Sequence, residues 1–266
     1  MRIALGLEYS GAPFTGWQSQ PDGRGVQDAL ERALGAIADA RVGTIAAGRT
    51  DTGVHATLQV VHFDSEAVRP ETAWVRGVNS HLPPDVAVQW AQPVPADFHA
   101  RFAASARHYT SLLVLRATRP ALLAGRVGWY HRPLDVGAMR EAAAALAGTH
   151  DFSAFRAAEC QAASPVKTLS TVAVDADGEV IRFEFSANAF LHHMIRNIVG
   201  ALVYVGAGKE PVTWTADLLA ARDRTRAAPT FAAAGLYLTG ADYDATWGLP
   251  PTRRSVRLPI VRESWR

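Results

Sequence analysis

The sequence predicts an α+β protein in which the order strand, helix, strand, strand, helix, strand occurs twice. Three observations lead to this prediction. The 266 residues are 48% hydrophobic and 20% charged, the composition of a folded chain with room for one large core or two modest ones. Short β-branched and aromatic runs alternate with stretches of helical periodicity. Pro93 and Pro95, just before residues 97–107, mark a boundary between two halves of similar element order.

The first half is expected to form one lobe over residues 1–105. Its expected elements are a strand at 3–9, a loop at 10–25, a helix at 26–39, strands at 44–47 and 58–63 on either side of a polar connection at 48–56, a helix at 70–82 and a strand at 86–90. The first helix is predicted from apolar residues at helical spacing, namely Val26, Leu30, Ala33, Leu34 and Ile37. The second begins at Pro70, because proline suits a first helical position, and ends at Pro83.

Residues 106–250 are expected to repeat this order in a second lobe, followed by a basic tail at 251–266. The expected elements are a strand at 109–115, an alanine-rich helix at 135–147 closed by Gly148, a hairpin of 169–174 and 180–185, a helix at 190–206 and a short strand at 236–238. This repeated order is that of two ferredoxin-like lobes. Their sheets are expected to lie edge to edge as one mixed sheet with a central cleft, a common place for ligand sites.

Positive charge concentrates in the second half of the chain. Residues 1–105 hold 8 Arg and Lys against 11 Asp and Glu, whereas residues 106–266 hold 19 against 14. Only Lys167 and Lys209 are lysines, so 25 of the 27 cations are arginines. The planar arginine fork suits phosphate and carboxylate groups, and a compositional habit of the source genome explains the excess equally well.

Nothing in the sequence calls for an oxidising compartment or a membrane. Cys160 is the only cysteine, so no internal disulfide can form. Polar residues come too early in residues 1–9 for a signal peptide, and no run of 18 apolar residues is present. We therefore expect a cytoplasmic protein without a membrane partner.

The densest polar cluster is the connection between the strands at 44–47 and 58–63, Gly48-Arg-Thr-Asp-Thr-Gly-Val-His-Ala56. Its glycines permit backbone conformations closed to other residues, and it presents a carboxylate, a guanidinium, two hydroxyls and an imidazole. Asp and Gly are also ordinary turn residues. A plain hairpin needs only about two to five connecting residues, however, so the length of this connection favours a functional loop.

A second candidate site opens the helix expected at 190–206. Apolar side chains form two stripes along it, so much of this helix is expected to be buried, and Arg196 lies between the stripes. A buried arginine needs a carboxylate partner. The alternative is an arginine that reaches solvent along the helix surface.

Other reaction classes lack their characteristic residues. His55 and His62 would face opposite sides of a sheet, and His192 and His193 would diverge by about 100° on a helix. No H-E-x-x-H pair and no cysteine cluster is present, so neither zinc nor iron is expected. The phosphate-binding glycine loops and the G-x-S-x-G elbow of hydrolases are also absent.

Taken together, these segments resemble the TruA family of tRNA pseudouridine synthases. The loop at 48–56 resembles the catalytic motif of that family. The other matching segments lie at 17–20 with 26–27, at 97–102 with 106–109, at 151–155 with 188–200, and at 228–238. The resemblance runs from about residue 3 to residue 245, and its five motifs follow the family's order.

The resemblance implies a pseudouridine synthase fold and a homodimer that isomerises uridine to pseudouridine at positions 38, 39 and 40 of the tRNA anticodon stem and loop. No metal or organic cofactor is implied. Asp51 would be the catalytic nucleophile, and Arg49 would help to displace the target base. Tyr109 would stack on the flipped uracil, and Arg196 would pair with Asp51.

Two positions depart from the family pattern, and two other interpretations stay open. His108 stands where arginine is favoured and Ser111 where an aromatic is common, which puts one phosphate contact and one packing contact beside Tyr109 in doubt. A tandem RNA-binding module would share the two lobes, but its aromatic stacking signature is missing from the predicted strands. A degenerate synthase that only folds tRNA would make the intact Asp51 dispensable.

Overall fold

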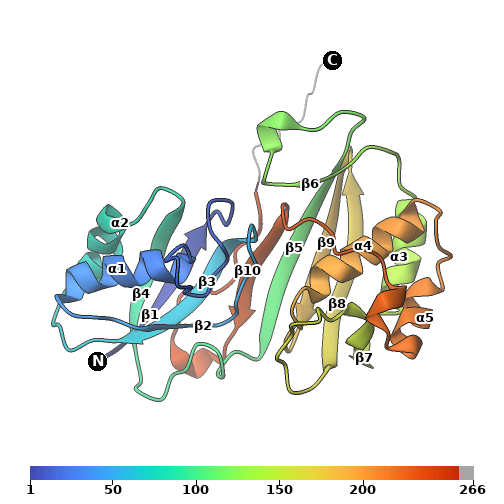
Figure 1. Ribbon diagram of the computed structural model, residues 1–266. Coiled ribbons are helices and arrows are strands. Elements are labelled where there is room, and N and C mark those ends of the chain that lie inside the picture. Colours follow the sequence, from blue (N-terminus) through green and yellow to red (C-terminus); the bar gives the residue numbers. More distant parts are fainter. Residues whose placement is uncertain (258–266) are drawn as a thin grey trace.

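A ten-stranded mixed sheet organises the protein (Figure 1). The structure is a computed structural model and describes residues 1–257. The strand order is β4-β1-β3-β10-β5-β9-β8-β7, with β2 added to β3 and β6 added to β5. The strands are β1 Arg2–Tyr9, β2 Thr44–Ala46, β3 His55–Asp64, β4 Val86–Val94, β5 Ala106–Leu115, β6 Gly128–Tyr130, β7 Gly148–Asp151, β8 Val166–Asp177, β9 Val180–Ala187 and β10 Leu236–Asp242.

Each half of the sheet has the strand order of a ferredoxin-like unit. In the first half, β1 lies between β4 and β3, and β2 pairs with β3. In the second half, β5 lies between β10 and β9, and β8 pairs with β9. All of these pairings are antiparallel, as the split β-α-β arrangement requires. The α+β class and the repeated element order predicted from the sequence are therefore confirmed.

Strand β10 joins the two halves, as the centre of Figure 1 shows. It pairs in antiparallel fashion with β5 and in parallel with the start of β3, where Tyr237 lies opposite His55 and Leu238 opposite Ala56. The polar connection that precedes His55 therefore lies where the two halves of the sheet meet.

Helices cover the sheet near both ends (Figure 1). The α-helices are α1 Val26–Ala38, α2 Val78–His81, α3 Val136–Ala144, α4 Met194–Gly206 and α5 Trp214–Ala221. A π-helical turn, η1 Ala73–Gly77, precedes α2, and short 3-10 turns form η2 Ala121–Leu123, η3 Ser153–Phe155, η4 Arg224–Arg226 and η5 Ala245–Trp247. None of these helices in residues 1–257 combines the length and the apolar character needed to cross a bilayer.

Apolar side chains pack on both faces of the sheet. The helices and one face share a large core, to which β5 contributes Leu113. The neighbouring residues Leu112 and Val114 point to the opposite face and pack in a smaller cluster. On that face of the first half, Phe98 from the segment between the halves packs against Trp247, with ring centroids 5.3 Å apart. The alternation along β5 is the period-2 pattern of a strand buried on both faces.

The structure corrects several predicted boundaries. Helix α4 begins at Met194 rather than at residue 190, because His193 adopts a left-handed backbone conformation with φ of 61°. Helix α3 ends at Ala144, and Gly148, expected to close it, instead begins β7 with φ of 99°. The elements β6, β7 and α5 were not predicted, since all three are short and lack a long periodic pattern.

The predicted basic tail at 251–266 lies partly within the described residues. Its first part runs along β10, where Arg253 forms a β-bridge with Gly240. The Arg254 guanidinium donates to the Glu8 carboxylate at 2.7 Å, and the Thr57 hydroxyl donates to the Arg254 carbonyl at 2.5 Å. Residues 258–266 of the tail lie outside the part that the structure describes.

Candidate active site

The polar loop at residues 47–54 is held from both sides. The Thr50 hydroxyl bonds the hydroxyl of Tyr9 at 2.8 Å, and the Thr50 carbonyl accepts from the backbone N–H of Trp17 at 2.9 Å. Gly16 passes so close that a Cβ there would lie 2.9 Å from the Thr50 carbonyl oxygen. Within the loop, the N–H of Val54 donates to the Asp51 carbonyl at 3.1 Å. The backbone is thereby fixed, and the Asp51 side chain remains available.

The Asp51 carboxylate faces three cationic or titratable side chains from the start of α4. The Nη1 atom of Arg196 lies 3.3 Å from Oδ2. The Nε2 atom of His192 lies 3.4 Å from Oδ1, and that of His193 lies 3.5 Å from Oδ2. The side chains of Asp51 and Arg196 are 20% and 17% exposed. A carboxylate from one half of the sheet thus meets a guanidinium and two imidazoles from the other half.

The left-handed backbone at His193 explains why both histidines reach the same carboxylate. On a regular helix, two consecutive side chains point about 100° apart. His193 is instead the N-cap of α4, with φ of 61° and ψ of 3°, and the two imidazole centroids lie only 4.0 Å apart. The sequence-based expectation that His192 and His193 diverge is therefore wrong.

Arg196 is anchored as well as paired. Its Nε donates to the Phe231 carbonyl at 2.9 Å, and the Phe231 N–H donates to the Arg196 carbonyl at 3.2 Å. The next residue, Asn197, is fully buried and accepts from Arg224 and Thr230 at 3.1 and 2.7 Å. These bonds fix the first turn of α4 against the chain segment that precedes β10, and with it the direction of the Arg196 side chain.

Tyr109 and Arg49 occupy contrasting positions beside the loop. Tyr109 on β5 is 8% exposed and meets Phe190 edge to face, with ring centroids 5.1 Å apart. Its hydroxyl lies 3.7 Å from the point that a Cβ on Gly48 would occupy. Burial raises the pKa of Tyr109 well above its usual value, so the phenol stays protonated. Arg49 is exposed and makes no hydrogen bond or ion pair within residues 1–257, so its guanidinium is free to meet a ligand.

The electrostatics of the cluster keep His193 uncharged near neutral pH. Burial lowers the pKa of His193, and the neighbouring His192 and Arg196 lower it further. The Asp51 carboxylate opposes these effects without reversing them.

Arg107, within the matching segment at 106–109, links three segments around the site through its guanidinium. Its guanidinium donates to the Ala47 carbonyl at 3.1 and 3.2 Å, to the Asn188 carbonyl at 3.0 Å and to the Ala104 carbonyl at 2.9 Å. These carbonyls belong to the start of the Asp51 loop, to the segment before α4 and to the segment between the halves. Burial lowers the pKa of Arg107. No spacing in the sequence could reveal such backbone partners.

The two departures from the family pattern are both interior positions. His108 is 5% exposed, its Nδ1 bonds the Ser186 hydroxyl at 2.7 Å, and its Nε2 lies 2.9 Å from Asp242. A buried imidazole in this place does not contact phosphate. Ser111 is also buried, on β5 between β10 and β9.

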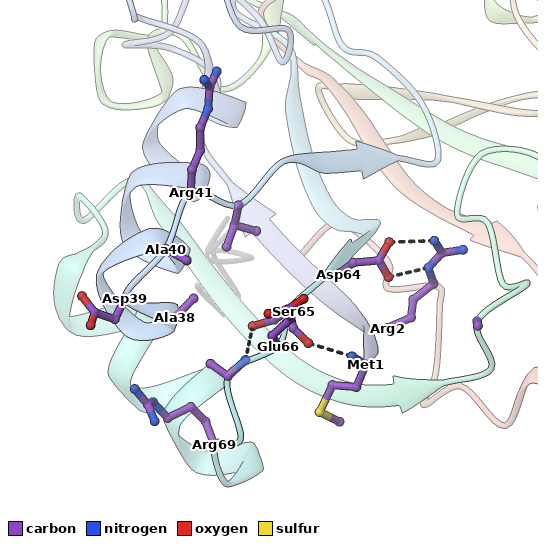
Figure 2. Close-up of a pocket in the computed structure, with 13 residues that line it drawn as sticks. Met1, Arg2, Ala38, Asp39, Ala40, Arg41, Asp64, Ser65, Glu66 and Arg69 are labelled. Atoms are coloured by element: carbon purple, nitrogen blue, oxygen red, sulfur yellow. Dashed lines mark hydrogen bonds and ion pairs between the residues drawn. The ribbon is translucent and has the colours of Figure 1, made fainter.

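Asp51 lines neither of two surface hollows. The larger, of about 860 Å³, is at the end of β1 where Arg2 pairs with Asp64 at 2.8 and 2.9 Å and the N-terminal amine donates to the Ser65 carbonyl at 2.7 Å (Figure 2). Tyr9, which contacts the Asp51 loop, is at the opposite end of β1. The other hollow is lined in part by Glu8, Tyr9 and Tyr237, so it lies nearer to the Asp51 loop.

Comparison with known proteins assigns the chain to a family. A family model described as tRNA pseudouridine synthase matches residues 7–103 and 142–244, which include Asp51 and the start of α4. The chain belongs to the tRNA pseudouridine synthase family. The family predicted from the five motifs is thus confirmed, and these proteins are isomerases.

Relatives named tRNA pseudouridine synthase A match this family member over almost its whole length. The protein of Thiobacillus denitrificans is 61% identical over 98% of this chain and 100% of its own length. That of Methylobacillus flagellatus is 59% identical over the same shares, and that of Dechloromonas aromatica is 60% identical over 94% of this chain and 95% of its own. A crystal structure of a Cbf5-Nop10-Gar1 complex matches with a TM-score of 0.31 at 11% identity, over 76% of this chain and 45% of that one.

Proposed function

We propose that this protein isomerises uridine to pseudouridine at positions 38, 39 and 40 in the anticodon stem and loop of tRNA, with Asp51 as the nucleophile. One observation carries the proposal. Asp51 sits on a fixed loop between two strands, and an anchored arginine from the other half of the sheet lies 3.3 Å from its carboxylate. The 59–61% identical relatives named tRNA pseudouridine synthase A support the RNA class.

The reaction suits a single carboxylate. The N1–C1′ glycosidic bond breaks, the uracil turns, C5 bonds to the same C1′, and the proton lost from C5 is balanced by one gained at N1. No electrons leave or enter, so the reaction as written needs no redox cofactor. Asp51 has three routes open to it: attack on C1′, attack on C6, or removal of a proton from the sugar. In each route the carboxylate acts in its ionised form, and the Arg196 guanidinium, 3.3 Å away, would hold it in position.

The target base must leave the helical stack before Asp51 can reach it. Unstacking costs a few kcal/mol, which an aromatic face for the base and a cation in the vacated place would offset. Tyr109 is an aromatic ring beside the Asp51 loop, and Arg49 is an exposed guanidinium on that loop without a protein partner in residues 1–257. We assign Tyr109 to stacking on the flipped uracil and Arg49 to displacing it, with Arg196 holding Asp51.

The partners and location follow from the same assignment. The surplus of arginines in the second half suits contact with tRNA phosphates. We expect the protein to act as a homodimer in the cytoplasm, with one lobe at 1–105 carrying the Asp51 loop and the other at 106–250 carrying α4.

The proposal is tested with unmodified tRNA transcripts. Purified protein is incubated with a tRNA that has uridine at positions 38 to 40, and pseudouridine is then mapped along the whole RNA. A matched transcript with cytidine at those three positions serves as control. Pseudouridine at 38 to 40, and none in the control, supports the proposal. Pseudouridine at other positions would overturn the site assignment.

A further inference from the structure

The carboxylate and the two imidazoles form a group of metal-ligand type within the proposed active site. We infer that a divalent ion of the late first transition row, Zn²⁺ above all, binds between Asp51, His192 and His193 in the RNA-free protein and so blocks the carboxylate. The inhibitory part of this inference rests on the proposed function, whereas the ion binding itself does not.

The donor atoms already stand at distances close to those of a metal site. One ligand atom from each of the three residues can be chosen so that all lie within 4.8 Å of one another. The Nε2 atoms lie 3.4 and 3.5 Å from carboxylate oxygens of Asp51. In a tetrahedral site with bonds of about 2.0–2.1 Å, neighbouring ligand atoms are about 3.4 Å apart. Small shifts of the side chains would therefore complete a three-ligand site.

The chemistry of the three donors selects the kind of ion. Two imidazole nitrogens and one carboxylate suit zinc, cobalt, nickel or iron, whereas magnesium and calcium prefer oxygen ligands alone. Three protein ligands also leave a coordination position open for water. The side chains of His192 and His193 are 40% and 27% exposed, so an ion can approach from solvent.

The backbone holds the two imidazoles together before any ion arrives. A non-glycine residue with positive φ is uncommon, and such strain persists only where the surroundings enforce it. Here the His193 carbonyl accepts from the Asn197 N–H at 2.9 Å, and the His192 carbonyl accepts from the Ala157 N–H at 3.0 Å. The entropy of bringing both rings to one point is thus lost on folding and not on binding the ion.

Arg196 opposes the ion, and this opposition gives a distinctive prediction. Its Nη1 lies 3.3 Å from the Asp51 Oδ2 atom, so a cation at the same carboxylate is repelled by the guanidinium. Replacing Arg196 by the neutral Gln should therefore strengthen ion binding, even though it removes a partner of Asp51. A purely structural role of the histidines would not predict that direction.

The test uses Co²⁺ as a coloured substitute for Zn²⁺, with the full-length protein and no RNA present. We expect one Co²⁺ per chain with the visible absorption of a protein site of low coordination number, displaced by Zn²⁺. Loss of a residue that only hydrogen-bonds a metal ligand already lowers metal affinity by about 10–100-fold. Loss of a ligand itself should cost at least as much, so His192→Gln and His193→Gln should each weaken Co²⁺ binding by at least about tenfold. His131→Gln changes an exposed histidine far along the chain and is the matched control.

The outcomes separate this inference from the proposed function. Absence of a Co²⁺ complex in wild type, or equal Co²⁺ affinity of wild type and both active-site histidine variants, would overturn it. Circular dichroism checks that each variant folds. If Co²⁺ binds as described, Zn²⁺ should slow pseudouridine formation by wild type and His131→Gln alike, and a chelator should restore the rate. Zn²⁺ that binds without slowing the reaction would overturn the inhibitory part, and an absence of pseudouridine formation without metal would count against the proposed function alone.

Discussion

Replacing Arg196 by Gln removes the guanidinium from Asp51 while keeping a neutral polar side chain, shorter by two atoms. At 3.3 Å, the attraction between unit charges is about 5 kcal/mol for an effective dielectric constant of about 20, before any loss of hydration is counted. Both side chains are about one-fifth exposed. The cost should therefore lie between about 1 kcal/mol for an exposed pair and about 3–5 kcal/mol for a buried one. We expect about 2–3 kcal/mol, or a rate about 30–150-fold slower.

The assay is single-turnover pseudouridine formation with the protein in excess over tRNA, so that weaker binding does not mask the chemical step. Arg196→Lys keeps the charge but loses the planar fork, and with it the bond from Nε to the Phe231 carbonyl. The lysine variant should recover only a small part of the rate. Arg132→Gln, at an exposed position outside the cluster, is the control and should react like wild type. A lysine variant as fast as wild type would show that Arg196 does not orient Asp51.

Three further predictions use other parts of the molecule. Tyr109→Leu should slow the single-turnover rate much more than it weakens tRNA binding, because stacking on the uracil follows base flipping. Tyr109→Phe keeps the aromatic stack and serves as the comparison. Equal losses of rate and affinity for Tyr109→Leu would contradict this role. Burial lowers the pKa of His62 to about 4, below its usual value of about 6.5. Protonation of His62 therefore favours the unfolded chain, and up to about 3 kcal/mol of the free energy of unfolding is lost as the pH falls from about 6.5 to about 4. In His62→Asn, urea unfolding should depend less on pH over that range, and an unchanged dependence would refute the assignment. The double change Arg222→Gln and Arg226→Gln should weaken tRNA binding and reduce the salt slope by up to about 2, whereas an unchanged slope would place these exposed arginines away from the RNA.

Arg224 is left out of that last variant because its side chain supports helix α4. It lies between Arg222 and Arg226 in the chain. Its guanidinium donates to the Ala228 carbonyl at 2.9 Å and to the Asn197 amide oxygen at 3.1 Å, which makes it part of the support for α4. A variant that reversed all three charges would therefore confuse loss of RNA contact with loss of structure.

The sequence predicted those features that local pattern determines. Helical spacing located α1, alternation and turn residues located the β8–β9 hairpin, and the unusual length of the polar connection singled out the loop at 48–56. The choice of Asp51 within that loop came from the family resemblance. The helix pattern indicated that Arg196, if buried, would need a carboxylate partner, and the family resemblance implied Asp51; the structure shows this pair. The inferences from pattern use neighbours in the chain or general rules of burial, and both are readable from sequence.

Features that depend on distant backbone contacts were not predictable in this way. Nothing local shows that His193 takes a left-handed conformation, so the two imidazoles were expected to diverge and α4 to begin four residues early. The carbonyl partners of Arg107 come from three separate segments of the chain. The parallel pairing of β10 with β3, which places the Asp51 loop beside the second half, likewise joins residues about 180 positions apart.

The central claim is that the Asp51 carboxylate performs the isomerisation, and Asp51→Asn tests it most directly. This change removes the nucleophile but almost no volume, and the backbone bonds of the loop do not involve the side chain. Single-turnover pseudouridine formation and tRNA affinity are measured on the same preparation, with a tRNA that carries uridine at positions 38 to 40. We predict no detectable pseudouridine and an affinity within a few-fold of wild type. A variant that retained even about a tenth of the wild-type rate would contradict the claim.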